Sequence, residues 1–183
     1  MVYNNFLLRL LFSLIFILSY LVLTYINFDY VFYLILLIYF LIFLETLIYF
    51  KKYVIIPIIY IIISLSFFVS IEFSNNIFLS FNLFIFTVIT FDIFSYITGK
   101  VFGKNKFIEI SPNKTIEGLI GGFIFSLSLS FIFSYFIYNA INKELFIFII
   151  LTIISAFIGD LIESFYKRKN KLKNSSEFIP GHG

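Results

Sequence analysis

The sequence contains no cysteine, no tryptophan, a single histidine and few charged residues. The lack of cysteine excludes disulfides, thiolate zinc sites and cysteine nucleophiles. The single histidine, His182, excludes a metal site built from several histidines. Charged residues make up 13% of the 183 residues and hydrophobic residues 61%, whereas soluble domains carry about 25% charge. This composition excludes a disordered chain and disfavours a water-soluble domain, which leaves a protein that crosses the membrane several times.

Alanine is also nearly absent, with Ala140 and Ala156 the only two, while phenylalanine, isoleucine and tyrosine abound. Codons rich in A and T encode these abundant residues, so we attribute the excess to the codon bias of an AT-rich genome. The aromatic residues are therefore not interpreted as a binding surface.

Long apolar stretches predict six transmembrane helices, because about 20 apolar residues cross the hydrocarbon core. Their unbroken length favours helices over strands, since in lipid each backbone group must be bonded within its own segment. The predicted spans are Phe6–Ile26, Tyr30–Phe50, Tyr53–Ile71, Ile77–Gly99, Ile116–Tyr138 and Leu145–Phe165. The predicted fold class is therefore all-α and polytopic. We expect N-terminal transmembrane helices in residues 1–75 and a catalytic transmembrane region with cytosolic loops in residues 76–183.

Lysine and arginine are distributed unevenly between alternate loops. If the N-terminus lies in the cytosol, the cytosolic segments hold every basic residue of the 13 except Lys143. Basic loops stay on the cytosolic side during insertion. We therefore expect a cytosolic N-terminus, a location in the inner (plasma) membrane and a functional site that faces the cytosol.

Three acidic residues, Glu45, Asp92 and Asp160, fall well inside the predicted spans, and Glu163 lies just past Asp160. A charge at a helix centre costs about 2.5–3.5 kcal/mol on insertion scales, so such residues are usually functional or paired. Each precedes a cytosolic lysine by six to eight residues, which places it roughly 9–12 Å inside the boundary. Acids at one depth indicate a polar chamber that opens to the cytosol. Two alternatives involve no function. Asp92 would form a structural hydrogen bond with Tyr96, and Glu45 would snorkel to the interface. For Glu45 we prefer this second explanation.

The last predicted helix carries a second group of polar residues. Asp160, Glu163 and Ser164 share one helix face at positions i, i+3 and i+4. Carboxylates among oxygen ligands suit a hard cation such as Mg²⁺. Lys167 and Arg168 follow one to two turns later and offer cations for phosphate groups.

Residues 100–115 form a long basic loop before the fifth span. Ser111 and Thr115 are candidate N-caps, with Pro112 opening the next helix. Lys114 beside a capped helix N-terminus favours phosphate oxygens, and the following glycines permit close helix packing or close approach of a substrate. Together, acids for a metal and cations for phosphates within the lipid layer indicate phosphoryl or nucleotidyl transfer to a lipid headgroup.

Three motif blocks support this interpretation. They are Asp92–Lys104, Ser111–Gly118 and Gly159–Gly183, and the last contains Ser164, Lys167, Arg168, Lys173 and a terminal turn, Ile179-Pro180-Gly181-His182-Gly183. At these residues the chain resembles the phosphatidate cytidylyltransferase (CDP-diacylglycerol synthase) family. The resemblance covers about residues 90–183, and the first three predicted helices match only as apolar spans.

The resemblance implies a reaction and a set of site residues. Phosphatidate and CTP would give CDP-diacylglycerol and pyrophosphate with Mg²⁺, with Asp160 as metal ligand and Lys167 and Arg168 on the phosphates. The implied substrate-binding residues are Asp92, Ser111, Lys114, Thr115, Glu117, Glu163, Ser164 and His182, the last orienting the terminal turn. The expected partners are these substrates and membrane lipid, with no nucleic acid, and a homodimer is left open.

Two departures from the family pattern keep alternatives open. Asn174 stands where the family usually has Asp, and the sequence ends at Gly183, before the family's second glycine and its Asp-Arg-x-Asp segment. One alternative is therefore a truncated, non-catalytic membrane relative. Another is an ion-coupled transporter with Asp92 and Asp160 as relay carboxylates, which the lack of inverted repeats disfavours.

Overall fold

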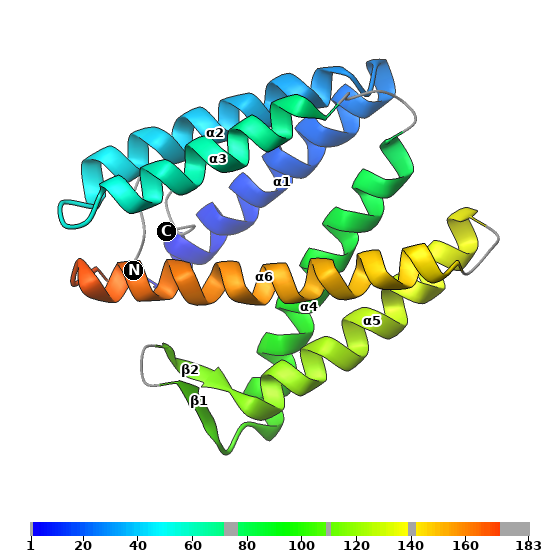
Figure 1. Ribbon diagram of the computed structural model, residues 1–183. Helices are drawn as coiled ribbons and strands as arrows, with labels where there is room; N and C mark the ends of the chain where they lie inside the picture. The colour runs from blue at the N-terminus through cyan, green and yellow to red at the C-terminus, as the bar shows by residue number, and fades with distance from the viewer. Residues whose placement is uncertain (1, 72–76, 109–110, 139–141, 173–183) are drawn as a thin grey trace. The chain divides into compact units, whose positions relative to one another are not determined.

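The computed structural model describes residues 2–71, 77–108, 111–138 and 142–172, in which it has six helices and one two-stranded sheet (Figure 1). Every predicted span coincides with a helix. The helices are α1 (Val2–Ile26), α2 (Tyr30–Tyr49), α3 (Ile55–Ser70), α4 (Phe78–Phe102), α5 (Ile116–Tyr138) and α6 (Lys143–Lys169). The strands are β1 (Lys106–Ile108) and β2 (Ser111–Thr115).

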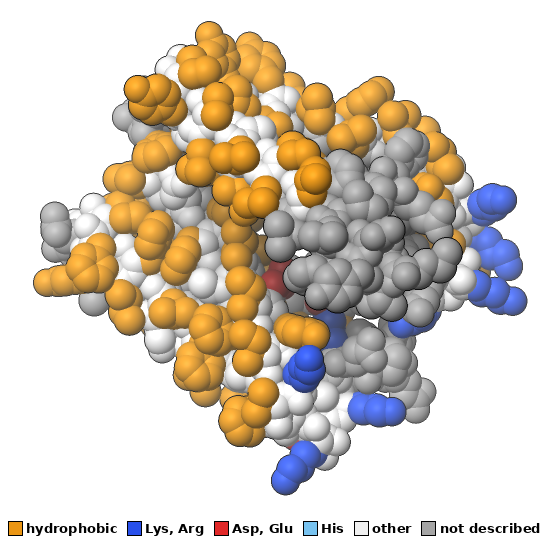
Figure 2. Space-filling view, turned by 180° about the vertical axis from the view of Figure 1, so that it is seen from behind, with side chains coloured by type: hydrophobic (Ala, Val, Ile, Leu, Met, Phe, Trp, Pro, Cys, Tyr) orange, Lys and Arg blue, Asp and Glu red, His pale blue; other side chains and the backbone are white. Residues whose placement is uncertain are grey.

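Four of the described helices, α2, α4, α5 and α6, are long and apolar enough to cross a membrane. The apolar segment Leu14–Ile26 of α1 and the helix α3 are shorter. Large hydrophobic side chains remain exposed along the helices, and they cover much of the face in Figure 2. These features fit a helical membrane protein, whereas the count of six spans stays a prediction.

The chain divides into two compact units, one formed by residues 1–76 with 166–183 and the other by residues 77–165. In the first unit α2 packs against α1 and α3. Tyr39 on α2 and Ser64 on α3 share a hydrogen bond of 2.6 Å between their hydroxyl oxygens. The rings of Phe32 and Phe68 stack with centroids 5.3 Å apart. The sequence-based division after residue 75 was drawn by expected role and stays a prediction.

In the second unit, α4 and α5 pack along a stripe of small residues. The buried residues of α5 recur every fourth position: Gly118, Gly122, Ser126, Ser130 and Ser134. This is the small-xxx-small spacing that lets two membrane helices approach closely. The Thr87 hydroxyl on α4 lies 2.9 Å from the Ser130 hydroxyl, and both side chains are fully buried.

The glycines at the start of α5 serve this packing. A Cβ atom on Gly118 would lie 2.8 Å from the Ser95 carbonyl oxygen, and one on Gly122 would lie 2.7 Å from the Ser95 Cβ. The sequence left two roles open for the glycines, close helix packing and close approach of a substrate. These contacts support close helix packing. Helix α6 joins the unit through a core of Leu83, Phe91, Ile149 and Ile153.

The chain is mainly helical, as predicted, but the loop predicted over residues 100–115 is in part a β-hairpin that the sequence analysis did not predict. Strand β1 pairs antiparallel with β2, with Lys106 opposite Thr115 and Ile108 opposite Ser111. Ser111 and Pro112 lie in β2 and therefore neither cap nor open a helix. Proline is tolerated here because a two-stranded sheet has only edge strands, in which not every N–H is needed. Helix α5 begins at Ile116, as predicted.

Candidate active site

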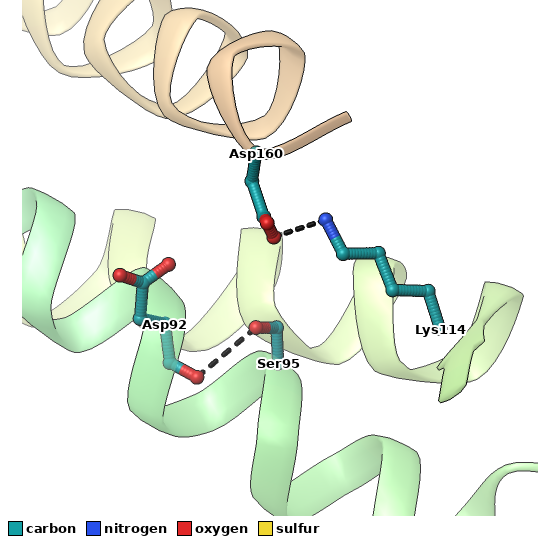
Figure 3. Close-up of polar contacts among 4 residues, drawn as sticks. All are labelled: Asp92, Ser95, Lys114 and Asp160. Carbon is teal, nitrogen blue, oxygen red and sulfur yellow. Dashed lines mark hydrogen bonds and ion pairs between the residues drawn. The ribbon is translucent and has the colours of Figure 1, made fainter. Parts of the chain in front are cut away.

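An ion pair between Lys114 and Asp160 joins two of the motif blocks. Lys114 lies in β2 and Asp160 in α6, and their side chains point toward one another (Figure 3). The Lys114 ammonium nitrogen is shielded from solvent, and the Phe157 ring centroid lies 5.8 Å from it. A buried cation needs a nearby negative charge to offset its lost hydration. Asp160 supplies that charge, so the hairpin and α6 meet at a polar contact.

Asp92 on α4 belongs to the same charged group. Its carboxylate lies close enough to Asp160 and Lys114 for both charges to act on it, and Figure 3 shows it on the α4 turn that carries Ser95. The Ser95 hydroxyl donates to the backbone carbonyl of Asp92 at 3.1 Å, so this bond does not involve the carboxylate. Among the described residues Asp92 has no bond to Tyr96, the alternative considered from the sequence. The Tyr96 ring is 67% exposed, with the Lys100 ammonium 5.8 Å away.

These residues suit a Mg²⁺ ion that takes part of its ligands from a bound phosphate. No group of three or more His, Cys, Asp or Glu side chains in the described part of the chain could hold a metal. Mg²⁺ commonly uses one or two carboxylates together with substrate phosphates instead of a complete protein cage. Asp160 and Asp92 are two such carboxylates within reach of each other's charge. The donor set therefore suits Mg²⁺ that arrives with a phosphate ligand.

Thr115 and Glu117 fix the junction between the hairpin and α5. The Thr115 hydroxyl accepts a hydrogen bond from the Gly118 amide at 3.1 Å, which confirms Thr115 as the N-cap. The Glu117 carboxylate accepts from the Lys104 amide at 3.2 Å, and from the Asn105 amide at 3.2 Å and side-chain amide at 2.9 Å. In addition, the Ile116 amide donates to the Asn105 carbonyl at 3.0 Å. Glu117 thus holds the segment that precedes β1 against the first turn of α5.

Replacing Glu117 with Ala should release this segment. The Lys104 and Asn105 amides would lose the carboxylate that accepts from both, so their hydrogen exchange should accelerate at least about tenfold. Hydrogen–deuterium exchange with mass spectrometry on residues 103–108 would measure the change. Replacing the exposed Glu144, in the first turn of α6, with Ala is the matched control. Equal protection in both variants would contradict the role given to Glu117.

The remaining predicted residues are distributed over several parts of the chain. Glu163 and Ser164 follow Asp160 on α6, and Lys167 and Arg168 lie in its last turn, within residues 166–183 of the other compact unit. Ser111 contributes its backbone to β2, and its side chain lies outside the described residues. His182, Lys173, Asn174 and the terminal turn also lie outside them. The roles predicted for all these residues therefore stay predictions.

Two contacts were missed by the sequence reasoning. Lys114 was assigned to a phosphate pocket and Asp160 to a metal, and nothing in their motifs indicated that the two pair with each other. Asn105 was not singled out, although it provides two of the hydrogen bonds that hold Glu117. Both contacts depend on the hairpin, which the sequence did not predict.

Comparison with known proteins agrees with these motifs. A model of the cytidylyltransferase family matches residues 2–183. Among curated proteins, a phosphatidate cytidylyltransferase of Haemophilus influenzae is 44% identical over 95 residues, which are 49% of this chain and 33% of the relative. That of Staphylococcus haemolyticus is 42% identical over 49% of this chain and 35% of the relative. That of Staphylococcus saprophyticus is 41% identical over 57% of this chain and 42% of the relative. No solved structure matches.

The matched segments therefore cover well under half of the length of these relatives. The family model, in contrast, covers this chain almost from end to end, including the hairpin and the helices that carry Asp92 and Asp160. By that match, the chain belongs to the cytidylyltransferase family.

Proposed function

We propose that the protein containing this chain makes CDP-diacylglycerol and pyrophosphate from phosphatidate and CTP, in phospholipid biosynthesis. The observation that carries the proposal is the meeting of Lys114 and Asp160, one from each of two family motifs, next to Asp92. The similarity to phosphatidate cytidylyltransferases supports these two substrates. The family match favours neither a non-catalytic relative nor an ion-coupled transporter.

The proposed reaction needs no covalent enzyme intermediate. A phosphate oxygen of phosphatidate attacks the α-phosphorus of CTP, the new P–O bond forms, and the bond to the β-phosphate oxygen breaks as pyrophosphate leaves. Catalysis of such a transfer consists mainly of positioning and of neutralising charge on the phosphates. Mg²⁺, held by Asp160 and Asp92 and by the substrate phosphates, would supply Lewis-acid stabilisation of that charge.

The chain's own cations complete the proposed site. Lys114 neutralises Asp160 when no phosphate is near, and its flexible stem lets the ammonium turn toward a phosphate oxygen when substrate binds. Lys167 and Arg168 would contact the triphosphate. Thr115 and Glu117 hold the hairpin in place for Lys114, which gives them a positioning role in the substrate pocket. Ser111, Glu163, Ser164 and His182 are kept as further substrate-binding residues.

A cytosolic site at the inner membrane follows from the same proposal. The distribution of basic residues supports a cytosolic location for the hairpin and the end of α6, on the side of the membrane where CTP is found. Six spans, one for each of α1 to α6, would give this orientation and a cytosolic N-terminus. Phosphatidate would reach the carboxylates laterally from the surrounding lipid. The homodimer stays a prediction.

Transfer of label from CTP to lipid tests the proposal. Membranes that contain the protein are incubated with CTP labelled in the cytidine ring, phosphatidate and Mg²⁺. We expect a labelled organic-soluble product and one pyrophosphate for each label transferred. Phosphatidylcholine in place of phosphatidate should give no product, because its phosphodiester lacks the attacking monoester oxygens. Failure to form a Mg²⁺-dependent lipid product would contradict the proposal.

A further inference from the structure

A cavity of about 550 Å³ lies where the turn after α2 meets the end of α6. All its lining residues belong to one compact unit, formed by residues 1–76 and 166–183. Four of them are lysines: Lys51, Lys52, Lys169 and Lys171. No acidic side chain is among the described residues that line the cavity. None of the four lysines has a role in the proposed transfer, although Lys169 and Lys171 lie within the motif block Gly159–Gly183.

Specific contacts hold the two sides of the cavity together. The Lys52 amide donates to the Asn170 side-chain oxygen at 2.7 Å, although the two residues are 118 positions apart. The Asn170 side-chain nitrogen in turn donates to the Tyr166 carbonyl at 3.1 Å. The Lys169 ammonium lies over the Tyr53 ring, 4.6 Å from its centroid. The lysines are therefore presented by a fixed frame, and Asn170 is the residue that joins its halves.

The backbone at both edges of the cavity has an unusual conformation. Tyr53 and Lys171 are the two non-glycine residues with positive φ in the described part of the chain, at 59° and 57°. Such residues persist only where the surrounding structure determines them strongly, and they are frequent at ligand-binding positions. The need to set the topology of the protein explains lysines near helix ends. The positive φ of Lys171 is that of a helix C-cap, because the Leu172 amide donates to the Lys167 carbonyl at 2.9 Å and the Lys171 amide to the Arg168 carbonyl at 3.0 Å. Tyr53, which follows the lining residue Lys52, is the position that the helix end does not explain.

The lining matches an amphiphilic anion. Ile48 and Leu172 line the cavity beside the four lysines, so apolar and cationic surfaces adjoin. The apolar helix α2 ends at Tyr49 and α6 ends at Lys169, which puts the cavity at the ends of membrane-crossing segments, where lipid headgroups lie. Four ammonium groups, with no acidic side chain among the described residues that line the cavity, attract a phosphate. Basic pockets at such positions bind anionic headgroups.

We propose that this cavity binds the phosphate of an anionic phospholipid headgroup as an accessory lipid site. The lysines contact the phosphate oxygens, and Ile48 and Leu172 contact the glycerol and the first acyl carbons. The site is separate in its residues from the proposed cytidylyl transfer. Its ligand need not be a substrate, so the two proposals can fail independently.

Binding of phosphatidylglycerol to the purified full chain tests the site, since this lipid is anionic and is not the proposed substrate. Native mass spectrometry from detergent gives its affinity, with zwitterionic phosphatidylcholine, which has no net charge, as the reference. K51Q/K52Q and K169Q/K171Q should each lower the affinity roughly 30-fold, since each lysine near an anionic headgroup contributes a factor of about five. N170A keeps every lysine and should still weaken binding at least about fivefold, because the two halves of the frame separate.

Two control variants separate a built pocket from diffuse charge. K104Q/K106Q removes the same charge from the hairpin and should change the affinity less than twofold, as should N142A at the other end of α6. K51R/K52R should retain binding and show that loss in the glutamine variants is not misfolding. Equal losses in K51Q/K52Q and K104Q/K106Q, or full binding by N170A, would overturn the proposal. Displacement of the lipid by inorganic phosphate at equal concentration would overturn its assignment to a lipid.

Discussion

Replacing Asp160 with Asn should abolish the transfer of cytidylyl groups to lipid, with a loss of at least about a hundredfold in the labelled-CTP assay. The substitution keeps the size of the side chain and a partner for the Lys114 ammonium, but it removes the negative charge that binds a hard cation. A metal supplies several kcal/mol of charge stabilisation in phosphoryl chemistry, and each 1.36 kcal/mol is a factor of ten in rate. The initial rate of product formation at saturating Mg²⁺ measures the effect.

A binding measurement distinguishes the loss of a metal ligand from damage to the fold. Mn²⁺ binding in the presence of CTP, followed by electron paramagnetic resonance, should weaken in D160N while the unfolding temperature stays close to that of the parent. E144Q, in the first turn of the same helix, is the matched control and should retain both activity and Mn²⁺ binding. An activity of D160N within threefold of the parent would remove Asp160 from the proposed mechanism.

Substituting Gly118 or Gly122 with Ala should destabilise the contact between α4 and α5. The added Cβ would lie 2.8 Å from the Ser95 carbonyl oxygen in one case and 2.7 Å from the Ser95 Cβ in the other, within a helix that cannot yield locally. Overpacking of this kind costs about 1–3 kcal/mol. Reversible unfolding in mixed micelles with increasing SDS would measure the loss of stability for each variant.

Gly159 provides a matched control for these substitutions. It is also a helical glycine, but a Cβ added there would meet none of the described residues within 4 Å. G159A should therefore be neutral or slightly stabilising, because alanine has the higher helix propensity by about 1 kcal/mol. Similar destabilisation in G159A and G118A would mean that backbone flexibility, and not the packing of α4 against α5, explains the glycines.

The helices could be predicted from the sequence because their signal is local. An apolar run of about 20 residues determines a membrane helix by itself, and Thr115 ahead of Ile116 marks the start of α5 by its capping hydroxyl. The hairpin could not be predicted in this way. Its strands have three and five residues, one contains Pro112, and their pairing depends on contacts with α5. Propensity carries little information for elements that short.

The site was predictable in part for the same reason. Counting residues from the ends of the spans puts Asp92 and Asp160 at a similar depth, and the structure brings their charges within reach of each other. Depth alone does not reveal which cation faces which acid. Lys114 reaches Asp160 because β2 folds back beside α6, and Glu117 binds Asn105 because β1 starts where it does. These contacts depend on tertiary structure and leave no periodic pattern.

The crowded glycines also bear on how the sequence can change over generations. Of the six described glycines, five lie where an added Cβ would meet α4, α5 or Thr115 within 3.1 Å: Gly99, Gly103, Gly118, Gly121 and Gly122. Every glycine codon begins with two guanines, so mutation toward A and T tends to remove it. Exposed phenylalanine and isoleucine can exchange under that pressure with little effect on lipid contact. We therefore expect related sequences of similar composition to keep glycine where an added Cβ would collide at the α4–α5 contact.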